Sequence, residues 1–399
     1  MAGAPIIKQV AYRAALLIGL IVAGCTSVRE APPKPLGAQF TAVAFSDLPD
    51  WRLDRVADAL TALRRSCGRL LKKPVSSLMT DRSIGGRARD WVPACRSLPP
   101  DGTGDLTARL YFETWFQAYQ VSDGGKTDGL FTGYFEPNLR GSEHRGSTFN
   151  VPLYERPDDL ILATLGDWRE KLRGERIAGR IIDGRLKPYH SRADIEAGAL
   201  SKKATPLVWV DDPIDAFFLH IQGSGRVLLP DGGVLRVGYD GHNGHVYHAI
   251  GRDLIKSGEI KKQNISLQSI RAWLKAHPDR MRDVMNRNPS YIFFRSIKGE
   301  GPIGAQGVPL SPGRSLAVDP RVIPLGAPVW LVADHGDEAG RPLRRLMIAQ
   351  DTGGAIRGAV RGDVFWGHGE SAAALAGPMK ATGQIYLLLP RTLKVVRGR

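Results

Sequence analysis

The sequence contains no long-period repeat, few cysteines and no recognisable nucleic-acid-binding motif. Neither zinc-finger spacing nor an RNP-type aromatic strand accompanies its basic residues, which are scattered along the chain. The formal net charge of +15 still favours an acidic partner, such as an anionic polymer or an anionic membrane surface. A length of 399 residues suits two domains, and 43% hydrophobic and 24% charged residues are typical of a soluble globular protein.

The N-terminal apolar run is too short to span a bilayer as a stable helix. It extends from Ala14 to Gly24 behind two basic residues, which predicts a secretory signal over residues 1–24. The small residues before Cys25 resemble a bacterial lipobox, in which the cysteine becomes the lipidated first residue. Because Thr26 follows it rather than aspartate, we expect a lipoprotein on the periplasmic face of the outer membrane. A soluble periplasmic protein is the alternative. Export also argues against nucleic acid as a partner.

Residues 25–44 are predicted to be a tether, because the proline-rich run 31–35 is semi-extended. Beyond it only Cys67 and Cys95 remain as thiols. An oxidising periplasm would permit a disulfide between them. Two buried thiols are the alternative, since sequence does not show whether the Cα atoms approach closely enough.

The hydrophobic periodicity predicts a mainly β protein with flanking α-helices. Apolar residues recur at helical spacing in two early segments, Leu48–Leu71 and Leu106–Tyr119. After Gly124, short β-prone runs alternate with glycine and aspartate turns. Strands are expected at 130–135, 206–210, 216–222, 291–295, 314–332, 343–350 and 383–389, and helices at 191–200, 246–257 and 267–286. Short strands with bent corners favour a small barrel over a doubly wound sheet.

The glycine-rich segment 350–370 is the strongest candidate for chemistry. It holds two carboxylates, Asp351 and Asp363, with Phe365 and Trp366 directly after the second. A carboxyl beside aromatic groups loses hydration, which raises its pKa toward that of a general acid. Glycoside cleavage needs such an acid. A glycine-rich barrel corner in which the aspartates cap turns is an equally good interpretation of the local chemistry.

Two other motifs favour carbohydrate binding. In the turn after residue 221, Gln222 and Ser224 offer hydrogen bonds to sugars, and Gly225 lets the backbone approach a ligand. The order Gln-Gly-Ser-Gly-Arg does not complete a nucleophile elbow, and a plain tight turn is the alternative. The segment 132–137 combines a hydroxyl, two aromatic rings and the carboxylate of Glu136, although strand aromatics often belong to the core.

Three histidines, His242, His245 and His248, recur at a spacing of three residues. They suggest a zinc hypothesis. The Asn-Gly pair between the first two makes a helical turn doubtful there, and no carboxylate is fixed nearby to orient the rings. We therefore expect structural or substrate-contacting histidines and no metal.

Several motifs occur in the order found in one family. These motifs are Thr132-Gly133-Tyr134, Gln222–Gly225, Asn243-Gly244, Asn288–Phe294, Val308–Leu310, Asp351–Gly358 and Gly362-Asp363. Together they resemble the membrane-bound lytic murein transglycosylase A family, over a region from about Phe45 to Leu389.

The resemblance implies a double-psi β-barrel with an inserted second β-rich domain and a groove between them for a glycan strand. The barrel, with N-terminal helices, would comprise residues 45–136 and 296–399, and the insert residues 137–295. The implied substrate is peptidoglycan, with no metal or organic cofactor. Proteins of a wall-synthesis complex are further candidate partners.

The implied reaction cleaves the β-1,4 bond from N-acetylmuramic acid to N-acetylglucosamine and forms a 1,6-anhydromuramoyl end. The C6 hydroxyl attacks internally, so one carboxyl can serve first as acid and then as base. Family motifs assign this role to Asp363 and a supporting role to Asp351. The residues carried over as groove contacts are Thr132, Tyr134, Gln222, Ser224 and Gly225.

Two rival interpretations remain. A hydrolase on the same barrel would use Asp351 or Glu136 as a second carboxyl. A non-catalytic glycan-binding lipoprotein would bind the wall without releasing fragments.

Overall fold

The computed structural model describes residues 37–80, 84–172, 175–200, 203–336 and 340–393. The predicted signal, the lipidation residue Cys25 and most of the predicted tether lie outside these residues. All described residues belong to one compact unit. The predicted mainly β composition with accompanying helices is confirmed. No helix among the described residues has both the length and the apolarity to cross a membrane.

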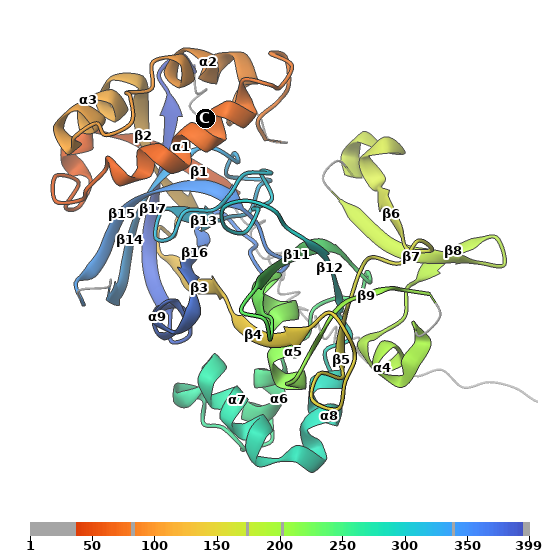
Figure 1. Ribbon diagram of the computed structural model, residues 1–399. Coiled ribbons are helices and arrows are strands. Elements are labelled where there is room, and N and C mark those ends of the chain that lie inside the picture. The colour runs from red at the N-terminus through yellow and green to blue at the C-terminus, as the bar shows by residue number, and fades with distance from the viewer. Residues whose placement is uncertain (1–36, 81–83, 173–174, 201–202, 337–339, 394–399) are drawn as a thin grey trace, which may run out of the picture. The chain divides into compact units, whose positions relative to one another are not determined.

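The largest sheet has eight strands in the order β1-β2-β17-β14-β15-β13-β16-β3. Because β3 also pairs with β17, the six strands from β17 to β3 in this order form a closed ring of pairings, and β1 and β2 lie outside it (Figure 1). The strands are β1 (Ala38–Val43), β2 (Phe116–Asp123), β3 (Gly129–Glu136), β13 (Ser315–Ala317), β14 (Pro328–Gly336), β15 (Pro342–Asp351), β16 (Arg361–His368) and β17 (Lys380–Pro390). Both faces of this sheet are covered: Trp330 and Leu387 point to opposite faces, since Leu387 pairs with Val329, and both are fully buried.

Strand β1 lies within the segment predicted as a tether. It pairs antiparallel with β2, from Ala38 opposite Asp123 to Val43 opposite Ala118. Phe40 and Val43 pack against the main core, so apolar contact and the free edge of β2 together hold this segment as a strand. The tether prediction is wrong for these six residues.

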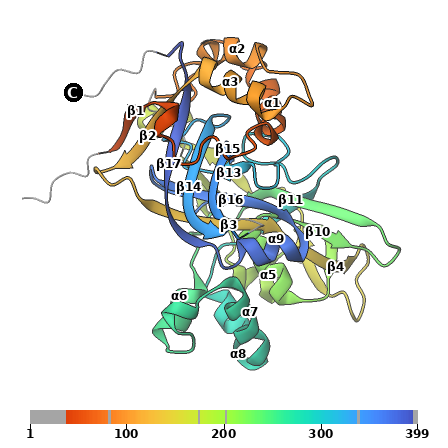
Figure 2. The same ribbon diagram turned by 90° about the vertical axis from the view of Figure 1, so that its left-hand side faces the viewer.

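Four helices accompany this sheet: α1 (Asp58–Leu70), α2 (Ala88–Arg96), α3 (Asp105–Trp115) and α9 (Gly369–Ala376). Helix α1 packs on β15, α2 on α1 and β17, and α9 on β3 and β16 (Figure 2). A disulfide joins Cys67 of α1 to Cys95 of α2, with 5.3 Å between the Cα atoms.

A second sheet has six strands in the order β12-β11-β10-β4-β9-β5. They are β4 (Asn138–Ser142), β5 (Val151–Tyr154), β9 (Pro206–Val210), β10 (Ser224–Leu228), β11 (Val234–His242) and β12 (Ile292–Ser296). The helices of this region are α4 (Arg192–Asp194), α5 (Pro213–Gln222), α6 (Ile250–Lys256), α7 (Leu267–Ala276) and α8 (Pro278–Asn286). A third sheet contains β6 (Ile161–Thr164), β7 (Arg176–Ile182) and β8 (Arg185–Pro188).

The predicted strand at 216–222 is wrong, because this segment is the C-terminal part of helix α5. Asp212 caps the helix by accepting hydrogen bonds from the backbone of Ile214 and Asp215, and Pro213 occupies its first turn. Gly223, at φ 79°, ends it in the left-handed conformation. These capping residues outweigh the β-like apolar run.

The two early helices are shorter than predicted. Helix α1 begins only at Asp58, and α3 ends at Trp115, where the chain continues as β2. The predicted helix at 267–286 is two helices, because Pro278 cannot continue the hydrogen bonding of α7. The strands predicted at 130–135 and 206–210 are confirmed as β3 and β9.

Removing the disulfide is expected to destabilise the packing of α1 against α2. Replacing Cys67 and Cys95 together by alanine frees a loop of 28 residues in the unfolded chain, which corresponds to a loss of about 3.5 kcal/mol. Denaturant unfolding of the double variant measures this loss. An unchanged unfolding midpoint would contradict it.

Candidate active site

Asp363 lies on β16 and Thr132 lies directly opposite it on the parallel strand β3. The hydroxyl of Thr132 donates a hydrogen bond to Asp363 Oδ1 over 2.7 Å. Arg361, two residues earlier on the same strand, donates from Nη2 to the Thr132 hydroxyl over 2.8 Å. Because side chains two apart on a strand share a face, Arg361 and Asp363 both face this hydroxyl.

The pKa of the Asp363 carboxyl is raised to about 6, chiefly by burial. The hydrogen bond from Thr132 and the charge of Arg361 lower the pKa, whereas the charge of Asp351 raises it. The residue as a whole is partly exposed, and dense neighbouring atoms remove most of the hydration of its carboxyl. A carboxyl with this pKa can act as a general acid.

Asp351 ends β15 and both of its carboxylate oxygens accept hydrogen bonds. Tyr134 donates its hydroxyl to Oδ2 over 2.8 Å, and the backbone N–H of Ala305 donates to Oδ1 over 2.9 Å. Burial raises the pKa of Asp351, and these hydrogen bonds lower it. Burial and the neighbouring Asp351 carboxylate raise the pKa of Tyr134 well above its usual range, so the tyrosine keeps its proton. Asp351 is therefore a fixed hydrogen-bonded group beside the acid.

The second glycine-containing turn lies beside β3. Gln222 ends α5, and its side-chain oxygen accepts a hydrogen bond from the backbone N–H of Phe135 over 3.1 Å. Ser224 begins β10 directly after the turn. At Gly225 an added Cβ would lie 2.5 Å from a methyl group of the buried Leu219 and 3.1 Å from the carbonyl oxygen of Pro137, so a larger residue would require the Leu219 side chain to shift. The structure thus brings these three residues to the end of the strand that carries Thr132.

Glu136, at the end of β3, is only 1% exposed. Burial raises its pKa, while Arg236, Arg226 and a hydrogen bond with Ser224 lower it. One carboxylate oxygen has no hydrogen-bond partner among the described residues. A carboxyl this deeply buried does not reach a polymeric substrate without movement, which disfavours it as a second catalytic carboxyl.

The three histidines have separate partners. His242 accepts a hydrogen bond from the backbone of Gly244, whereas His245 contacts the carbonyl of Tyr189. His248 lies 2.9 Å from an Asp253 oxygen. Within the described ranges no cluster of three or more histidine, cysteine or acidic side chains could hold a metal ion.

Two contributors to the site are absent from the sequence-based prediction. Arg361 donates a hydrogen bond to the Thr132 hydroxyl, and its charge lowers the pKa of Asp363. Its position two residues before the acid, on the same face of the strand, was a usable signal in the sequence. The backbone of Ala305, which donates to Asp351, is separated from it by 46 residues and left no local signal.

Family models match both parts of the chain that supply these residues. The MltA specific insert domain matches residues 130–295, and the 3D domain matches residues 314–389. The membrane-bound lytic murein transglycosylase A of Escherichia coli strain K12 is 35% identical over 264 residues. That alignment covers 65% of this chain and 65% of the relative, so it spans slightly less than two thirds of the relative's length.

Solved structures agree with these matches. The membrane-bound lytic murein transglycosylase from Agrobacterium tumefaciens is 33% identical with a TM-score of 0.79, covering 88% of this chain and 98% of that chain. Escherichia coli MltA with bound chitohexaose is 28% identical with a TM-score of 0.63, covering 88% and 94%. The family expected from the ordered motifs is confirmed. The chain belongs to the membrane-bound lytic murein transglycosylase A family.

Proposed function

We propose that this protein is a peptidoglycan lytic transglycosylase that uses Asp363 as its single acid and base. The observation that carries the proposal is the carboxyl of a partly exposed residue, whose pKa is raised to about 6 by burial and which accepts a hydrogen bond from Thr132. The names of the relatives and the chitohexaose bound to the Escherichia coli structure support a glycan substrate.

In the first step, protonated Asp363 gives its proton to the glycosidic oxygen while the bond from muramic C1 to that oxygen breaks. In the second step, the Asp363 carboxylate takes the proton of the muramic C6 hydroxyl while the C6 oxygen forms a bond to C1. The proton of the hydroxyl thus replaces the one donated, and no water is consumed. Orientation of the sugar takes the place of an external nucleophile.

Asp351 would support this chemistry by its charge. A fixed carboxylate near Asp363 disfavours ionisation of the acid before it reacts, and it stabilises positive charge that develops on the sugar. We assign Tyr134, Gln222, Ser224 and Gly225 to contacts with the glycan. Their position at the end of β3 beside the acid supports this assignment.

We further propose a double-psi β-barrel with a glycan-binding insert. The return of strand pairing after six strands supports the barrel. The separate matches over residues 130–295 and 314–389 support an insert close to the predicted 137–295. Attachment to the outer membrane through Cys25 is proposed from the lipobox-like sequence, and the relatives' designation as membrane-bound supports it.

Mass spectrometry of purified sacculi digested with the protein tests the reaction. A transglycosylase releases fragments with 1,6-anhydromuramoyl ends, whereas a hydrolase on the same site adds one water to each cleaved bond. Fragments with only reducing ends would assign the protein as a hydrolase. Binding to sacculi without release of fragments would identify the protein as a non-catalytic glycan-binding lipoprotein.

Thr132→Val is expected to shift the pH dependence of turnover upward. Without the hydroxyl, the ionised form of Asp363 loses a hydrogen bond, so the pKa of the carboxyl rises above about 6. The protonated acid then persists to higher pH, and the alkaline limb of the kcat profile moves in that direction. Turnover itself falls about 10²-fold, because the carboxyl is no longer held in place.

Thr132→Ser is the matched control, since it retains the hydroxyl. The alkaline limb of its kcat profile should lie at the same pH as that of the wild-type protein. An unshifted limb in the valine variant would show that another group sets the pH dependence.

A further inference from the structure

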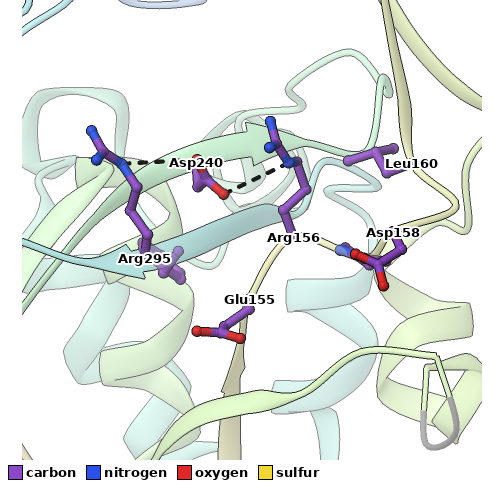
Figure 3. A pocket seen from close by; sticks show the side chains of 8 residues that line it. Glu155, Arg156, Asp158, Leu160, Asp240 and Arg295 are labelled. Carbon is purple, nitrogen blue, oxygen red and sulfur yellow. Dashed lines mark ion pairs between the residues drawn. The ribbon is translucent and has the colours of Figure 1, made fainter.

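A cavity of about 380 Å³ opens on the six-stranded sheet beside β11 and β12 (Figure 3). The segment that follows β5 supplies one wall, and the two strands supply the other. Its principal lining residues are Glu155, Arg156, Asp158, Leu160, Asp240 and Arg295. None of these residues belongs to the site described around Asp363.

Asp240 occupies a β-bulge in this cavity. Tyr239 pairs with Phe294 and Gly241 pairs with Phe293, which leaves Asp240 as the extra residue between them. A bulge redirects the side chain that it carries. Gly241 has φ 151°, and a Cβ at that position would lie 3.3 Å from the side chain of Arg156. The backbone is therefore shaped to let an arginine approach the bulge.

Two arginines flank the Asp240 carboxylate. The Nε atom of Arg156 lies 3.7 Å from Oδ2, and the Nε atom of Arg295 lies 3.8 Å from Oδ1. Both contacts use Nε, and neither guanidinium donates a hydrogen bond to another described residue. The arginine side chains are 44% and 55% exposed, so their terminal amino groups remain available to a ligand. One aspartate offsets only one of the two positive charges.

The opposite side of the cavity is acidic. Glu155 and Asp158 extend from the segment after β5, on the other side of the cavity from the two guanidinium groups (Figure 3). Both are exposed, and neither forms an ion pair with a described residue. The cavity thus offers planar donors for a carboxylate at one end and carboxylates for an ammonium group at the other.

We propose that this cavity binds a short peptide carrying a free carboxylate and a free ammonium group. The proposal rests on the proposed function and names a further part of its substrate, the peptide stems attached to the glycan. Ser224, assigned to the glycan groove, pairs with Gly238 of β11. Asp240 follows two residues later, about 7 Å along the strand. A stem on a glycan bound at Ser224 is therefore within reach of the cavity.

Equilibrium binding tests the cavity directly. The probes are the dipeptide L-lysyl-D-alanine, its C-terminal amide and its fully N-acetylated form, titrated against the full chain by calorimetry. The unmodified dipeptide is expected to bind, and each capped form to bind at least tenfold more weakly. The double variant R156Q/R295Q should also weaken dipeptide binding at least tenfold.

Arg140→Gln is the matched control, because Arg140 is an exposed arginine of the same sheet that pairs with Asp211. It should bind the dipeptide as the wild type does. Equal binding of all three probes, or unchanged binding in R156Q/R295Q, overturns the proposal. Thermal unfolding of each variant verifies that the fold is retained.

Turnover separates this proposal from the proposed function. At subsaturating substrate, the wild type is expected to act about tenfold faster on glycan strands with peptide stems than on strands stripped of them. R156Q/R295Q should lose that preference. Absence of anhydro products from both substrates refutes the proposed function, while the dipeptide titration still decides the cavity. If the wild type releases anhydro products equally fast from both substrates, the cavity does not bind the peptide stems, whereas the proposed function stands.

Discussion

Asp363→Asn is expected to retain binding to sacculi and to lose release of anhydromuropeptides by about 10⁴-fold. The amide can still accept the hydrogen bond from Thr132, so the geometry of the site is preserved. It cannot donate a proton to the glycosidic oxygen or remove one from the C6 hydroxyl. Quantifying anhydro ends by mass spectrometry, with a separate sedimentation assay for binding, measures both outcomes.

Stability measurements at two pH values test whether unfolding causes this loss. Since burial raises the folded-state pKa of Asp363 to about 6, the folded protein loses stability as the pH rises from the unfolded value near 4 to about 6, and the penalty is constant above that. Below the unfolded value, near pH 4, both states bind the proton and the penalty disappears. Asp363→Asn should therefore stabilise the protein by about 3 kcal/mol at pH 8 and leave its stability nearly unchanged at about pH 3.

Asp334→Asn is the matched control, since Asp334 is exposed on β14. It should change neither turnover nor stability. Substantial turnover in Asp363→Asn would remove this carboxyl from the mechanism and require another acid.

Arg314→Met is expected to destabilise the fold by about 3–5 kcal/mol. Arg314 is buried, and its two terminal nitrogens donate to both carboxylate oxygens of Asp54 over 2.7 and 3.0 Å. It also donates to the carbonyls of Leu346 and Arg55. Methionine fills much of the same volume but leaves the carboxylate of Asp54 buried without a counter-charge. Denaturant unfolding at equilibrium measures the change.

Two further variants separate the ion pair from general packing. Asp54→Asn combined with Arg314→Met removes the uncompensated charge, so the double variant should recover part of the lost stability. Arg140→Met breaks an exposed pair with Asp211 and should cost less than about 1 kcal/mol. If Arg314→Met costs no more than this exposed pair, the buried contact does not stabilise the fold.

Local sequence was sufficient to predict those strands and helices for which the apolar pattern and the flanking residues indicate the same secondary structure. Strands β3 and β9 followed from short β-prone runs between turns. Helix α5 was missed because it is apolar on most sides, so periodicity could not distinguish it from a buried strand. The capping residues Asp212 and Gly223 were the available signal, and they carry more information than the apolar run between them.

The site was only partly predictable for a different reason. Asp363 is recognisable from its motif, but its hydrogen-bond partner Thr132 is 231 residues away. Parallel pairing of β3 with β16 brings the two together, and that register depends on the closure of the whole sheet. The Arg156–Asp240–Arg295 cluster likewise depends on a bulge, which no local pattern in the sequence indicated.

Both neighbours of β3 come from the C-terminal end of the chain. The strand is flanked by β16 and by β17, which ends at Pro390. During synthesis, Thr132 is therefore made long before the segments that complete its surroundings. A nascent or truncated chain without β17 leaves one edge of β3 unpaired. The surroundings of Thr132 are therefore complete only when nearly the whole polypeptide has been made.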